Sequence, residues 1–163
     1  MVSPIEVAVG ELLHQRGWCR AFTVADMVEG WAAHVAAVEQ GYPHGPQEYV
    51  RGLRCRDWLH EAWFLLDHDT MAVWNQRIKD LDLAFVLATV YDDGAALSRL
   101  HPVAEDALWW WRRHPRLLTG PLGRALGGEG EGEGEGEGRG REETAQETQA
   151  EGAVEVAAPD ETD

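Results

Sequence analysis

The chain is poor in cysteine, lysine and serine, and it has no long apolar run. Its two cysteines, Cys19 and Cys55, could pair only in an oxidising compartment, so we expect both to act as small apolar side chains. The longest apolar stretch, residues 83–91, falls far short of the roughly 20 residues that span a bilayer. Residues 1–10 lack the basic start and the apolar run of a signal peptide. We therefore expect a cytoplasmic protein with reduced thiols that does not bind membranes.

Signals of catalysis are also missing from the sequence. Ser3 and Ser98 are the only serines, and neither lies in a Gly-x-Ser-x-Gly motif. No phosphate-binding glycine loop is present, since the glycines of residues 129–138 alternate with glutamates, which repel phosphate. Cys55 lies between two arginines that would lower its pKa if it were exposed, but a buried thiol on a helix is the commoner case. We predict that the protein is not an enzyme and uses no cofactor.

Two pairs of an acid and a histidine, Glu11 with His14 and Asp57 with His60, make a metal-binding helical bundle an alternative. On a helix their three-residue spacing places the carboxylate and the imidazole on one face, as in di-metal carboxylate bundles. The seven histidines of the chain would nevertheless form about one such pair by chance. Surface polar pairs are therefore the favoured interpretation, and we predict no metal site.

Charge divides the chain into two parts. The whole sequence has a net charge of −15, but residues 128–163 hold 13 of its 29 acids and only two arginines. Their Gly, Glu, Thr and Gln composition offers too little apolar surface for folding. We predict one helical globular domain over residues 1–127 and a disordered acidic Gly/Glu tail over residues 128–163.

Capping residues and apolar spacing predict two helices near the start of the chain. A Ser-x-x-Glu capping box at Ser3 precedes residues 4–16, and Thr23 makes a similar start for residues 24–40. Apolar residues recur at steps of three and four in both, which is typical of a helix with one buried face. The predicted buried faces are Val9, Leu12 and Leu13 in the first helix, and Val24, Met27, Val28, Trp31, Val35 and Val38 in the second.

Two longer helices follow, the third over residues 47–66 and a fourth with Asp69 or Thr70 as its cap. In the fourth, apolar residues make a heptad-like seam, which indicates a bundle helix and could equally face a second copy of the chain in a homodimer. The predicted fold is all-α, a bundle of about four helices closed by a Trp-rich C-terminal segment. Core candidates are Tyr49, Leu53, Leu59, Trp63 and Leu66 in the third helix, and Met71, Trp74, Ile78, Leu81, Phe85 and Ala88 in the fourth.

The helical pattern ends near residue 90. The Asp-Asp-Gly sequence of residues 92–94 predicts a turn, and residues 104–113 predict a short helix or a strand closed by Pro115. Gly120 and Gly123 favour irregular chain at the end of the domain.

Residues 109–116 are the most informative stretch of the chain. Three consecutive tryptophans cannot share one buried face on a helix or a strand, so at least one should lie at the surface beside the arginines. Flat aromatic rings and planar guanidinium groups are typical of recognition surfaces. The opposing interpretation is that two tryptophans seal one end of the bundle while arginine stems cover their neighbours. The predicted partner-binding residues are Trp109, Trp110, Trp111, Arg112, Arg113 and Arg116.

Residues 85–118 contain three short motifs: Ala-Thr-Val at 88–90, Asp-Asp-Gly at 92–94 and Trp-Trp-Trp-Arg-Arg-His-Pro at 109–115. With these motifs the chain resembles small uncharacterised proteins of high-G+C Gram-positive bacteria, some of which travel with plasmids or integrated elements. The resemblance implies a mobile-element accessory protein and assigns no residue a role.

We therefore predict a non-enzymatic cytoplasmic accessory or adaptor protein that docks an unidentified protein partner through residues 109–116. Plasmid transfer, plasmid maintenance and toxin neutralisation are the expected processes. A nucleic-acid-associated regulator using the same surface is an alternative, because stacking rings and arginines also bind exposed strands. The predicted domain, residues 1–127, is itself net negative and residues 107–128 hold only four arginines, which disfavours this alternative.

Overall fold

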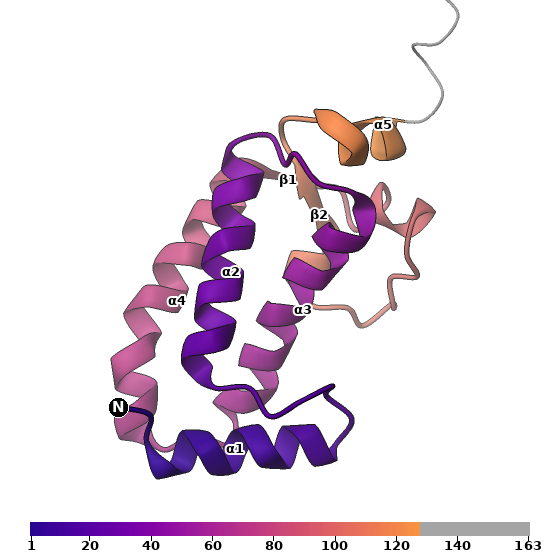
Figure 1. Cartoon of the computed structure of the whole chain (residues 1–163). Helices are drawn as coiled ribbons and strands as arrows, with labels where there is room; N and C mark the ends of the chain where they lie inside the picture. The colour runs from indigo at the N-terminus through magenta and orange to yellow at the C-terminus, as the bar shows by residue number, and fades with distance from the viewer. Residues whose placement is uncertain (128–163) are drawn as a thin grey trace, which may run out of the picture. The chain divides into compact units, whose positions relative to one another are not determined.

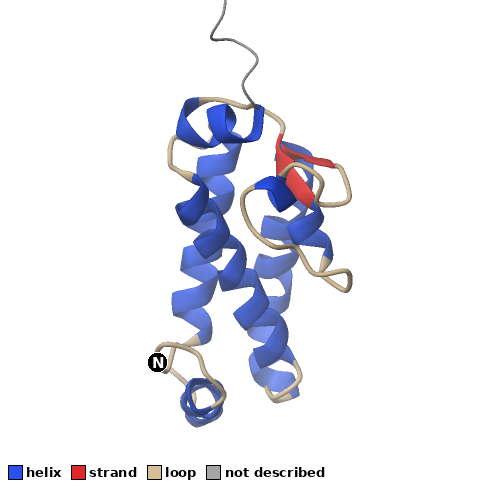
Figure 2. Ribbon diagram, turned by 90° about the vertical axis from the view of Figure 1, so that its right-hand side faces the viewer, coloured by secondary structure: helices blue, strands red, loops and turns tan. Residues whose placement is uncertain are grey.

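The computed structural model describes residues 1–127, and the predicted acidic tail, residues 128–163, lies outside the described residues. Three helices stand side by side and a fourth lies across one end of them (Figure 1). The three are α2 (Val24–Glu39), α3 (Pro46–Trp63) and α4 (His68–Ala88), and the crossing helix is α1 (Pro4–Gln15). Figure 2 shows α1 nearly end-on. The predicted all-α bundle is confirmed. No helix within residues 1–127 combines the length and the apolar composition needed to cross a membrane.

Side-chain caps fix where α1 and α2 begin, as predicted. The hydroxyl of Ser3 accepts a hydrogen bond from the backbone N–H of Glu6, whose carboxylate accepts one from the N–H of Ser3. Thr23 and Asp26 exchange the same pair of bonds at the start of α2. Each box satisfies two N–H groups that have no partner inside the helix.

The junction between α3 and α4 differs from the prediction. α3 ends at Trp63, because the next residues turn tightly and donate their backbone N–H groups to the carbonyl of Ala62. The cap of α4 is Asp67, whose carboxylate accepts a hydrogen bond from the N–H of Thr70 at 2.9 Å. The predictions of Asp69 or Thr70 as the cap are therefore wrong, and Asp69 lies in the first turn.

The core between α2, α3 and α4 is rich in aromatic rings. Every residue predicted for the buried face of α2 is buried, and the Trp31 ring lies 4.8 Å from that of Phe85 on α4. Trp63 and Trp74, both predicted for the core, are half-buried at its edge. The prediction for Leu12 is wrong: its side chain is exposed, because α1 crosses the end of the bundle and buries only a narrow strip.

Two carboxylates, one half-buried and one buried, link the helices. Asp82 on α4 accepts two hydrogen bonds from the guanidinium of Arg56 on α3, each at 2.9 Å, and one from the indole of Trp31 on α2 at 3.1 Å. Glu6 on α1 accepts a hydrogen bond from the indole of Trp74 on α4 at 3.2 Å. Because each carboxylate has donors from other helices, its burial is compensated and the helices are held in register.

After α4 the chain forms a small antiparallel sheet of β1 (Thr89–Tyr91) and β2 (Arg113–Pro115), with Val90 opposite His114. Between the strands lie two short 3₁₀ helices, η1 (Leu97–Arg99) and η2 (Trp109–Arg112). The tryptophans therefore share one 3₁₀ turn, where residues 104–113 were predicted to form one short helix or strand. Successive side chains leave such a turn about 120° apart, so the three tryptophans cannot all enter the core from one face.

The last described element, α5 (Gly120–Gly127), replaces the irregular chain predicted there. Gly120 has a φ of 61°, in the left-handed region that favours glycine. A Cβ on Gly123 would lie 2.4 Å from the backbone of the preceding loop, so glycine permits this close packing. Leu122 and Leu126 are buried on one face of the helix. The glycines thus allow a helix to fold back on the chain where the sequence favoured a break.

Candidate functional site

The tryptophans of η2 divide between the core and the edge of the molecule. Trp110 is 1% exposed, whereas Trp109 and Trp111 are half-buried. The Trp110 ring lies edge-on to His60, with centroids 5.8 Å apart, and the guanidinium of Arg56 lies 4.5 Å from its centroid. Trp110 is therefore a core residue that cannot contact a partner, and its prediction as a docking residue is corrected.

One carboxylate on α3 holds two of the three indoles. Oδ1 of Asp57 accepts hydrogen bonds from Nε1 of Trp110 and from Nε1 of Trp111, both at 2.8 Å. Burial raises the pKa of Asp57, while the two indole donors and Arg54 act in the opposite direction. A buried indole N–H needs an acceptor. By supplying one to both tryptophans, Asp57 links η2 to α3.

Two arginines of the segment bind backbone carbonyls at the end of α4. Arg113 donates to Oγ1 of Thr89 at 2.7 Å and to the carbonyl of Val86 at 3.1 Å. Arg116 donates to the carbonyls of Leu87 and Thr89, each at 3.4 Å. The last carbonyls of a helix lack partners within it and carry partial negative charge, so these guanidinium groups satisfy and stabilise the helix end.

Arg112 closes the loop between the two strands. Its Nε donates to the carbonyl of Ala107 at 2.9 Å, and its guanidinium pairs with the carboxylate of Asp93. Their hydrogen bond lowers the pKa of Asp93 and raises the pKa of Arg112. All three arginines predicted to bind a partner are thus engaged within the fold, and only Arg116 is exposed. We call residues 109–116, which comprise η2, β2 and Arg116, the clasp, because their side chains bind to α3 and to the end of α4.

The candidate metal ligands do not gather into one site. Nδ1 of His14 lies 2.6 Å from the carbonyl oxygen of Trp18, and Glu11 is exposed on α1. Asp57 is occupied by two indoles, and His60 packs against aromatic rings. Within residues 1–127, no three His, Cys, Asp or Glu side chains are placed to hold a metal ion together.

Three neighbouring hollows follow one side of α3. The first, of about 570 Å³, lies between α3 and the loop that joins α1 to α2. The second, of about 350 Å³, shares Trp18 and Arg54 with the first. The third, of about 280 Å³, shares Asp57, His101 and Trp111 with the second. Because each hollow shares lining residues with the next, the three adjoin one another along α3, and we call them together the α3 groove.

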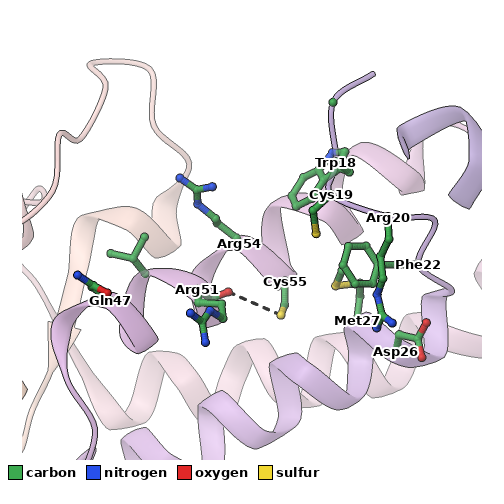
Figure 3. Close-up of a pocket in the computed structure, with 12 residues that line it drawn as sticks. Trp18, Cys19, Arg20, Phe22, Asp26, Met27, Gln47, Arg51, Arg54 and Cys55 are labelled. Carbon is green, nitrogen blue, oxygen red and sulfur yellow. Dashed lines mark hydrogen bonds between the residues drawn. The ribbon is translucent and has the colours of Figure 1, made fainter. Parts of the chain in front are cut away.

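The first hollow has an apolar floor. Figure 3 shows loop residues such as Trp18 and Phe22 facing α3 across it, with Met27 contributed by α2. Val50 and Cys55 of α3 complete the apolar lining. Burial raises the pKa of the Cys55 thiol, so this side chain stays protonated in spite of its arginine neighbours in the sequence.

The rim of the first hollow is positively charged. Arg20, Arg51 and Arg54 line it and are exposed, and Arg20 lies 4.5 Å from the ring centroid of Phe22. Among the described residues, none of these three arginines forms an ion pair. The one acid of the lining, Asp26, accepts the backbone N–H of the α2 cap. This end of the groove therefore offers three guanidinium groups that have no ion-pair partner within the described residues.

The rest of the groove is aromatic and of mixed charge. The rings of Trp111 and His101 stack with their centroids 5.4 Å apart. The indole of Trp18 donates to Glu61 at 3.2 Å. Glu61 and Asp57 thus bring negative charge to the middle of the groove, in contrast to its arginine-lined end.

Sequence reasoning missed Asp57 as an acceptor and missed the arginines of the first hollow. For Asp57 a signal existed, because consecutive tryptophans that enter a core need acceptors for their N–H groups. For Arg51 and Arg54 the three-residue spacing on α3 places both on one face, but their convergence with Arg20 depends on tertiary packing.

Comparison with known proteins found no matching family model, no matching curated protein and no matching solved structure.

Proposed function

We propose that the protein is a non-enzymatic cytoplasmic adaptor that binds an extended segment of a protein partner in the α3 groove. The succession of three adjoining hollows along one helix carries this proposal. The α3 residues that line them run from Gln47 to Glu61, which is roughly 20 Å along a helix axis. An extended segment of about six residues has this length. A long, shallow depression of this kind suits a peptide chain better than a compact small molecule.

The aromatic side chains along the groove support a protein partner. Trp18 and Trp111 are both half-buried and line it, so each presents part of a rigid ring. Tryptophan in such positions contributes much of the binding energy of protein interfaces. Trp111 is also the member of the predicted docking set that lines the groove, so the clasp takes part in the proposed site through this residue.

Charge in the middle of the groove favours protein over nucleic acid. Asp57 and Glu61 line the second hollow together with Arg54 and Trp111, where a strand tracking the groove would bring its phosphates. Carboxylates at that place repel phosphate, and the chain as a whole is net negative. A peptide can place neutral or basic groups there. From the resemblance of residues 85–118 we further propose plasmid transfer, plasmid maintenance or toxin neutralisation as the process.

Site-specific photo-cross-linking in host cells tests the proposal. A photoreactive amino acid replaces Gln47, which is exposed and lines the first hollow beside its arginines, and in a matched control it replaces Gln76, which is exposed on α4. We expect one protein adduct from position 47, absent from position 76 and lost when Trp18→Ala is added. Equal adducts from both positions, or none from position 47, would contradict docking in the groove.

A further inference from the structure

We infer that the segment bound in the α3 groove is acidic at one end and carries a large apolar anchor there, which enters the first hollow. This inference rests on the proposed function and assigns the chemistry of the partner. It follows from two independent features of the first hollow, its apolar floor and its unpaired arginines.

The floor of the first hollow suits an apolar side chain. Phe22, Met27 and Cys55 line it, and its volume of about 570 Å³ lies within the range of small-molecule sites. Phe22 packs edge-on against the fully buried Trp58, with centroids 6.5 Å apart, so the floor is anchored to the core. A flat or branched apolar side chain of a partner would therefore be desolvated on a preformed surface, which favours binding.

The arginines decide which residues flank that anchor. Arg56, Arg112 and Arg113 each donate hydrogen bonds within the fold. Arg51 and Arg54, three residues apart on one face of α3, form no ion pair among the described residues. A guanidinium group binds a carboxylate through two parallel hydrogen bonds. Acidic residues next to the apolar anchor are therefore the partner groups that this rim would bind.

The charge pattern along the groove also sets a direction. Glu61 and Asp57 lie farther along α3 than Arg51 and Arg54, so an acidic segment running the whole length would meet repulsion at its far end. The bound segment should therefore be acidic at the Gly17–Phe22 end of the groove only. Toward Trp111 and His101 it should present neutral, basic or aromatic residues, which can stack on these rings.

Selection from a random peptide library against the full chain tests this inference. We expect enriched peptides to carry one or more Asp or Glu residues beside a Leu, Phe or Trp. Arg51→Glu/Arg54→Glu should weaken binding of the enriched peptides roughly tenfold or more, because it replaces attraction by repulsion. Arg77→Glu/Lys79→Glu on α4 is the matched control, since it changes the net charge equally at exposed positions outside the groove. This control should bind as the parent protein does.

The location of binding is read from the indole N–H signals in a nitrogen–proton correlation spectrum. The Trp18 signal should shift on addition of an enriched peptide. Enriched peptides without acids, no enrichment, or equal loss of binding in both charge-reversed variants would each overturn the inference. Adducts from position 47 that persist in any of these cases would leave docking in the groove intact and refute only the acidic anchor. If those adducts are also absent, the proposed function fails as well.

Discussion

The ion pair between Arg56 and Asp82 offers the sharpest test of how this fold is held together. Two hydrogen bonds of 2.9 Å join the groups, and their side chains are only 14% and 18% exposed. Trp31 donates to the same carboxylate, and the Arg56 guanidinium lies over Trp110. Asp82→Leu would therefore leave a buried guanidinium and a buried indole N–H without an acceptor.

The size of the destabilisation follows from the two groups that lose their acceptor, the Arg56 guanidinium and the Trp31 indole. Removing one partner of a buried ion pair costs about 3–5 kcal/mol, and an orphaned buried donor costs about 1–3 kcal/mol. Since the two effects share one carboxylate, we expect Asp82→Leu to lower the free energy of unfolding by roughly 4–5 kcal/mol. Arg56→Met/Asp82→Leu removes the charge as well as its partner, so we expect a loss of only about 1–2 kcal/mol.

Urea unfolding followed by tryptophan fluorescence measures these free energies. Asp80→Leu, at an exposed position on the same helix, is the control and should change the free energy of unfolding by less than about 0.5 kcal/mol. The double variant should be more stable than Asp82→Leu alone. If it is equally stable or less stable, the uncompensated guanidinium is not what destabilises the single variant.

Three further predictions concern other parts of the fold. Burial lowers the pKa of His34 to about 3, so between its ordinary value of 6.5 and about 3 only the unfolded state takes up the proton. The free energy of unfolding should fall by up to about 1.4 kcal/mol per pH unit on acidification, and His34→Leu should lack this one-proton slope; an unchanged slope would contradict the assignment. Gly52→Ala should destabilise by about 2 kcal/mol or more, because its Cβ would lie 2.0 Å from Nδ1 of His34. Gly127→Ala, with open space around the Cβ, should be near neutral in the same urea titration. Cys19, which is exposed, should react with a thiol reagent roughly tenfold or more faster than Cys55, whose pKa is raised by burial. Comparable rates in the Cys19→Ser and Cys55→Ser variants would refute this ranking.

Helices α1 to α4 could be predicted because their signals are local. A capping residue lies within three positions of its helix, as Ser3 and Thr23 show, and the apolar stripe of α2 repeats inside one element. How a helix packs against the rest of the bundle is not a local property, and it explains the core predictions that were wrong. Leu12 fits the stripe of α1, yet α1 lies across the bundle end, so the stripe is wider than the surface available to cover it.

The sequence left open whether residues 109–116 seal the bundle or dock a partner, because the groups that they bind lie far away in the sequence. Asp57 precedes Trp110 by 53 positions, and Thr89 precedes Arg113 by 24. Without those partners, indoles and guanidinium groups resemble an exposed recognition surface. With them, most of the same side chains satisfy polar atoms within the fold. The first hollow was missed for the related reason that its arginines come from a loop and a helix separated in the chain.

Asp57 lines the groove and also accepts the hydrogen bonds of two indoles of the clasp. This double role decides which end of the groove can adapt to a bound segment. A ligand that displaced Trp111 would break its hydrogen bond to Asp57, at a cost of roughly 1–3 kcal/mol if the indole N–H stayed buried. The stacked His101 would lose its contact as well. At the other end, the side chains of Cys19 and Arg20 are exposed, although Phe22 of the same loop packs against Trp58. A bound segment should therefore find a preformed surface at Trp111, and at its acidic end the exposed side chain of Arg20 should turn to meet it.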